Sequence, residues 1–158
     1  MSSKADYTPE EWATLARAPF MTGLIVTLAS PSGITGLLGE SMVVTRSIIS
    51  ASQSHSTDPL LVSLIEDIKN TRGKIAQPAE RLTAENARLT AEATLRQVSA
   101  ILAHKATPQE AAAFKDWLRD IAQDAAEAAK EGGFFGIGGV QVNEAEKAAL
   151  ARVAELLA

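Results

Sequence analysis

Apolar side chains return every three or four residues along most of this chain, which is the spacing of one helix face. Helix start signals precede these stretches. Thr8-Pro9-Glu10-Glu11 and Thr107-Pro108-Gln109-Glu110 each combine an N-cap threonine, a first-position proline and a glutamate that completes a capping box. Asp58-Pro59 and Asn143 supply two further N-caps. Since no window sustains the alternation of a strand, the sequence predicts an all-α fold.

The predicted helices account for most of the chain. We expect them near residues 9–18, 19–29, 41–53, 59–71, 78–104, 108–130 and 143–157. A chain of 158 residues that is 46% apolar can bury a sizeable core. We therefore expect a single compact bundle of about six or seven helices. It would form one domain over 1–158, with halves 8–53 and 107–157 joined by central helices within 59–104.

Two segments resemble each other across these halves. Gly33, Gly36 and Gly39 match Gly133, Gly136 and Gly139, and the two Thr-Pro-x-Glu starts lie about 100 residues apart as well. In each copy, large apolar residues follow the first and second glycines. This pattern predicts an internal repeat, and hence a bundle with pseudo-twofold symmetry and two glycine-rich loops. Chance is the rival explanation, because both motifs are common.

The glycine-rich loops are the candidate binding sites. Glycines permit positive φ and let backbone amides approach an anion, although neither loop matches a nucleotide-binding motif. Phe134 and Phe135 could instead form an exposed contact patch for a partner. The structural alternative is that glycines end the preceding helices while the apolar residues fill the core. The candidate ligand- or partner-binding residues are Gly33, Gly36, Gly39, Gly133, Phe134, Phe135, Gly136 and Gly139.

Composition argues against several functions. The chain lacks cysteine, which removes thiolate metal sites and a cysteine nucleophile. A formal charge of −4 argues against nucleic-acid binding through a broad basic surface. Two histidines remain, and neither His55, in a serine-rich stretch, nor His104, near a helix end, stands in a recognisable catalytic motif. We expect no catalytic residues, no cofactor and no enzymatic activity.

Charged residues cluster at two places. Five carboxylates share one helix face over the helix predicted at 108–130 and the residue that follows it; they are Asp116, Asp120, Asp124, Glu127 and Glu131. Such a face can hold a hard cation, but a solvated acidic surface is the simpler interpretation. A modest basic strip, suited to phosphate contacts, comprises Arg72, Lys74, Arg81, Arg88 and Arg96.

The segment 18–39 is uncharged and long enough to raise the question of a membrane span. Turn residues at Ser30-Pro31-Ser32-Gly33 interrupt its apolar part, and backbone breaks are costly in lipid. We expect a buried helix followed by a loop, with contact to a membrane surface as the alternative. The start of the sequence does not resemble a signal peptide, so we expect a cytoplasmic location.

Residues 127–146, which include Gly-Gly-Phe-Phe-Gly-Ile-Gly-Gly, resemble a group of small bacterial proteins of uncharacterised function. The two halves are also similar to the tellurite-resistance TerB-like helical family, with 128–150 fitting its outline and 27–44 fitting it more loosely. That resemblance implies a helical fold of two related halves and metal binding through acidic loop residues. This sequence departs from the pattern, because Ser30-Pro31-Ser32 and Gly132-Gly133 replace the expected Asp-Gly. Glu131, Glu144 and Glu146 are the acidic residues nearby.

The leading hypothesis is a non-catalytic helical module that binds an unknown protein partner or small ligand, with a role in stress as one context. A metal-binding TerB-like stress protein and a membrane-surface-associated protein are the alternatives. Alanine-rich helix faces could also pair two copies of the chain as a homodimer.

Overall fold

The computed structural model describes residues 2–29, 46, 48, 50, 57–83, 85–131 and 144–158. In these ranges it contains five α-helices packed together and no strand, which confirms the all-α prediction. The helices are α1 (Pro9–Ala29), α3 (Pro59–Asn70), α4 (Ala87–Lys105), α5 (Pro108–Glu131) and α6 (Glu144–Leu157). Two short 3-10 helices, η1 (Lys4–Asp6) and η3 (Lys74–Ala76), complete the described elements.

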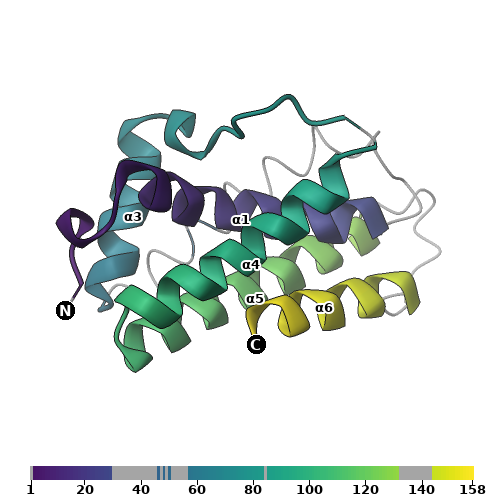
Figure 1. Ribbon diagram of the computed structural model, residues 1–158. Helices are drawn as coiled ribbons and strands as arrows, with labels where there is room; N and C mark the ends of the chain where they lie inside the picture. The colour runs from purple at the N-terminus through teal and green to yellow at the C-terminus, as the bar shows by residue number, and fades with distance from the viewer. Residues whose placement is uncertain are drawn as a thin grey trace.

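Helix α1 is the central element of the bundle. It packs against α3, α4, α5 and α6, and nearly every residue from Thr14 to Thr27 is buried (Figure 1). By length and composition α1 is the one described helix that could cross a membrane, and 72% of its apolar window is buried inside the bundle. The expectation of a buried helix in the first part of 18–39 is therefore confirmed.

The helix starts follow the capping signals. Thr8 and Glu11 exchange hydrogen bonds at the start of α1, where the Glu11 amide donates to Thr8 Oγ1 over 3.1 Å. Thr107 and Glu110 do the same at the start of α5. Asp58 accepts from the Leu61 amide at the start of α3. The expected bounds of α3, α5 and α6 agree with the structure to within a residue or two.

The predicted break between 9–18 and 19–29 is wrong, because α1 continues through Pro19. Proline removes one backbone hydrogen bond from a helix and crowds the preceding turn. Here Pro19 is buried inside the bundle, and the packing of the flanking turns against four other helices offsets that local cost.

The predicted helix over 78–104 begins later than expected, at Ala87. Thr83 and Asn86 exchange side-chain and backbone hydrogen bonds, and Asn86 Nδ2 also donates to the Arg81 carbonyl. These bonds hold the turn that leads into α4, and Asn86 already has helical backbone angles, with φ −98° and ψ −15°. Of the helix predicted over 41–53, Arg46, Ile48 and Ser50 are described and helical, and the rest lies outside the described residues.

One hydroxyl in the centre of α1 has no hydrogen-bond partner among the described residues. Thr14 and Thr27 each donate to the carbonyl four residues earlier, over 2.8 Å, whereas the buried Thr22 Oγ1 bonds to none of the residues that the structure describes. A buried hydroxyl without a partner costs free energy that an isosteric methyl does not. Thr22→Val is therefore expected to raise the free energy of unfolding by about 1 kcal/mol.

Urea denaturation monitored by circular dichroism measures that change. Thr27→Val is the matched control, since its hydroxyl is bonded to the Gly23 carbonyl and its loss brings no gain. A Thr22→Val protein no more stable than the wild type would show that the hydroxyl is satisfied.

Candidate functional site

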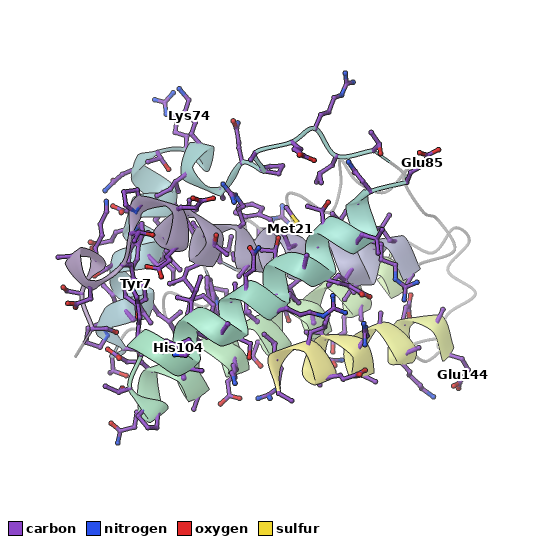
Figure 2. The ribbon with its side chains drawn as sticks, viewed as in Figure 1. Tyr7, Met21, Lys74, Glu85, His104 and Glu144 are labelled. Atoms are coloured by element: carbon purple, nitrogen blue, oxygen red, sulfur yellow. The ribbon has the colours of Figure 1, made fainter. Side chains whose placement is uncertain are left out.

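Three helices meet around a pocket at one end of the bundle. There α1 ends and both α4 and α6 begin (Figure 1). Glu85 and Glu144, which lie beside the starts of α4 and α6, are at the opposite end of the molecule from Tyr7 and His104 (Figure 2). The cavity has a volume of about 260 Å³. We call it the α1–α4–α6 pocket; its lining residues are Ile25, Leu28, Ala29, Arg88, Ala145, Ala148, Ala149 and Arg152.

The wall of this pocket is mainly apolar. Ile25, Leu28 and Ala29 belong to the last turns of α1, while three alanines of α6 face them across the cavity. Because alanine side chains are small, the first turns of α6 leave space between the helices that larger residues would fill. The two charged residues of the lining are arginines, one from α4 and one from α6.

A buried glutamate organises these arginines. The side chain of Glu92 is 9% exposed and accepts two hydrogen bonds from Arg152, over 3.2 Å from Nε and 3.0 Å from Nη2. Arg88 reaches the same carboxylate through Nε at 3.4 Å, and Arg96 Nη2 lies 3.6 Å from it. We call Arg88, Glu92, Arg96 and Arg152 the Glu92 cluster.

The hydrogen bonds of the cluster favour the ionised forms of Glu92 and Arg152. Hydrogen bonds from Arg152, and then from Arg88, lower the pKa of Glu92, although burial opposes them. Hydrogen bonds to Glu92 and to Glu155 raise the pKa of Arg152. Arg152 is held on both sides, since its Nη1 lies 3.0 Å from Glu155 Oε2. Arg88 is 71% exposed, and within the described residues its guanidinium meets Glu92 alone.

The glycine-rich candidates lie outside the described residues. This applies to Gly33, Gly36, Gly39, Gly133, Phe134, Phe135, Gly136 and Gly139, and also to His55. In the sequence, the two glycine-rich segments adjoin described residues at the pocket end of the bundle. Residues 30–45 follow Ala29, and 132–143 end one residue before Glu144, which precedes the lining residue Ala145.

Other predicted charged residues are placed on the surface. On α5, Asp116, Asp120, Asp124 and Glu127 are exposed, and Asp116 pairs with Arg119 at 2.8 Å, as a solvated acidic face predicts. His104 is exposed in the last turn of α4.

Glu144 and Glu146, two of the acidic residues that the metal-binding alternative would use, lie in different environments. Glu144 is exposed and pairs with Lys147, whereas Glu146 is buried. Within the described ranges, no group of three or more histidine, aspartate or glutamate side chains is placed to hold a metal ion.

The residues of the expected basic strip lie in different parts of the fold and do not form one surface strip. Arg88 and Arg96 belong to the Glu92 cluster, and Arg72, at φ 52°, and Lys74 lie in and after the turn that ends α3. Sequence analysis named Arg88 and Arg96 but missed Glu92 and Arg152. The spacing Arg88-x-x-x-Glu92-x-x-x-Arg96 was the available signal, because residues four apart share a helix face.

Comparison of the chain with protein-family models, curated proteins and solved structures found no match.

Proposed function

We propose that this protein is a non-catalytic helical binding module that takes a small ligand into the α1–α4–α6 pocket. The observation that carries the proposal is a cavity of about 260 Å³ with an apolar wall and two arginines. Ligand sites in proteins are typically concave and apolar with a few polar groups that orient the ligand. The volume lies just below the range of about 300–1,000 Å³ that is usual for such sites, so the ligand is small.

The chemistry of the lining favours binding over catalysis. Its charged side chains, Arg88 and Arg152, carry guanidinium groups that donate hydrogen bonds without accepting them. Such groups hold and neutralise an anion, but they do not act as a general base or a nucleophile. The remaining lining residues are aliphatic.

We also propose that the chain contains an internal repeat, which is compatible with a binding function. The two capping boxes are alike in hydrogen bonding, and the two glycine-rich segments each join a residue at or beside the pocket lining. A duplicated helical unit with pseudo-twofold symmetry would bring both segments to one end of the bundle. However, α1 is buried nearly all round whereas α5 has an exposed acidic face, so any symmetry is incomplete.

Filling the pocket should abolish ligand binding without unfolding the protein. Ala148 lines the cavity yet is exposed, so Ala148→Trp places a large ring in the pocket mouth at little cost in stability. Ala154→Trp is the matched control, because Ala154 is also exposed on α6 but is not part of the lining. The expected result is loss of binding in the first variant only.

Three probes with the same tail test the pocket for ligands of any charge: octanoate, octan-1-ol and octylamine. Each is titrated into the wild type and both variants, and the amide NMR signals of Ala145, Ala148 and Ala149 are followed. Saturable shifts with at least one probe, removed by Ala148→Trp, support the proposed function. If none of the probes shifts these signals, the pocket is not a ligand site.

A further inference from the structure

The Glu92 cluster carries more positive than negative charge. Its three guanidinium groups, on Arg88, Arg96 and Arg152, meet two carboxylates, Glu92 and the adjoining Glu155. The formal net charge of these five side chains is therefore +1. Such a surplus suits a ligand with a single negative charge, because a dianion would exceed it.

Arg88 is the residue best placed to use that charge. It lines the pocket, its side chain is 71% exposed, and its contact with Glu92 uses only Nε at the long distance of 3.4 Å. Arg152 is committed on both sides to glutamates. A guanidinium has five donors, so Arg88 can hold an anion in a forked geometry while it keeps its contact with Glu92.

The cavity sets the size of the rest of the ligand. A volume of about 260 Å³ has room for about nine non-hydrogen atoms, if each takes the volume of one water molecule, about 30 Å³. Ile25, Leu28 and the alanines of α6 offer this part of the ligand aliphatic contacts. A straight carbon chain of about nine or ten non-hydrogen atoms, with a carboxylate at the end that reaches Arg88, matches both the volume and the lining.

We infer that the α1–α4–α6 pocket binds a medium-chain aliphatic monocarboxylate, with the carboxylate on Arg88 and the tail against α1 and α6. This inference rests on the proposed function and specifies its ligand class. The juxtaposition of an exposed guanidinium with an aliphatic wall is what selects this class over a neutral or cationic amphiphile.

Calorimetric titration of the full chain with octanoate, octan-1-ol and octylamine tests the inference. Octanoate is expected to bind at least about tenfold more tightly than the other two. Arg88→Gln should weaken octanoate binding about tenfold and leave octan-1-ol binding unchanged. Arg88→Lys should recover part of the loss, since it restores the charge but not the fork.

Arg119→Gln is the matched control. Arg119 is an exposed arginine of α5 that pairs with Asp116, and it belongs neither to the pocket lining nor to the Glu92 cluster. Its substitution should change octanoate affinity by less than about twofold, and circular dichroism checks that both variants remain folded.

The outcomes separate the two levels of the proposal. Equal affinity for octan-1-ol and octanoate, or an Arg88→Gln protein that binds octanoate like the wild type, overturns the monocarboxylate while the pocket stays a ligand site. Absence of binding by all three probes overturns the proposed function itself.

Discussion

Leu95→Ala is expected to lower the free energy of unfolding by about 3 kcal/mol. Leu95 is fully buried, in the middle of α4, which packs along the central helix α1. Truncation removes the apolar contacts of three carbon atoms and leaves a cavity that the surrounding helices fill only in part. Since small domains have about 5–15 kcal/mol of stability, this is a large fraction of the total.

Leu89→Ala makes the same chemical change on the same helix and provides the control. Leu89 is 71% exposed, so its loss should change the stability by less than about 0.5 kcal/mol. Urea denaturation followed through the buried Trp12 and Trp117 measures both variants. Equal stabilities for the two variants would mean that α4 does not pack against the core through the Leu95 face.

The helix starts were predictable because their signals are local. A threonine, a proline and a glutamate within four residues satisfy the free amides of a first turn whatever the rest of the chain does. Both Thr-Pro-x-Glu segments form the hydrogen bonds that this logic requires. The exposed acidic face of α5 was predictable for the same reason, since helical periodicity alone places those carboxylates together.

The errors arose where distant packing outweighs local preference. Pro19 is a helix breaker in isolation, but four helices surround α1, and no feature of the flanking sequence reports that. The late start of α4 depends on Thr83 and Asn86, whose reciprocal bonds imitate a capping box with asparagine in the place of glutamate. A capping box is ordinarily recognised by a glutamate or glutamine at its last position, so Asn86 does not give that signal.

In the candidate site, too, local contacts could be predicted from the sequence and contacts between distant segments could not. Arg88 and Arg96 drew notice as part of a basic strip, and their spacing from Glu92 is readable from one helix. The decisive partner, Arg152, is 60 residues away on α6. Only the packing of α6 against α4 makes Glu92 the centre of an arginine cluster and places Arg88 and Arg152 at an apolar pocket.

The pKa of the Glu110 carboxyl is strongly lowered in the folded protein. It is 4% exposed, and it accepts hydrogen bonds from the Thr107 amide, the Ser2 amide and the Ser2 hydroxyl, each over 2.8 Å. Burial by itself raises the pKa of this group, but the hydrogen bonds outweigh it and lower the pKa from 4.5 to about 2. The carboxylate thereby joins the start of the chain to the first turn of α5.

Glu110→Gln should therefore destabilise the protein in a pH-dependent way. A pKa lowered from 4.5 to about 2 on folding corresponds to about 3 kcal/mol in favour of the folded state, because folding then favours the ionised form. This contribution is fully present above pH 4.5 and is lost as the pH falls toward about 2, where the folded protein also binds the proton. Glutamine cannot ionise, so the variant lacks this pH-dependent contribution to the free energy of unfolding at every pH. In addition, the glutamine amide nitrogen, itself a donor, faces hydrogen-bond donors where the second carboxylate oxygen accepted them.

Urea denaturation of the wild type and Glu110→Gln at two pH values tests this account. The difference in unfolding free energy should be about 3 kcal/mol near neutral pH and should shrink to about 1.5 kcal/mol at about pH 3, where the unfolded chain is already protonated. Glu11→Gln removes the equivalent capping glutamate of α1, whose side chain is 28% exposed, and a smaller loss is expected because water replaces the missing bonds. A difference for Glu110→Gln that is the same at both pH values would show that hydrogen-bond geometry alone, and not the charge of Glu110, holds the chain start against α5.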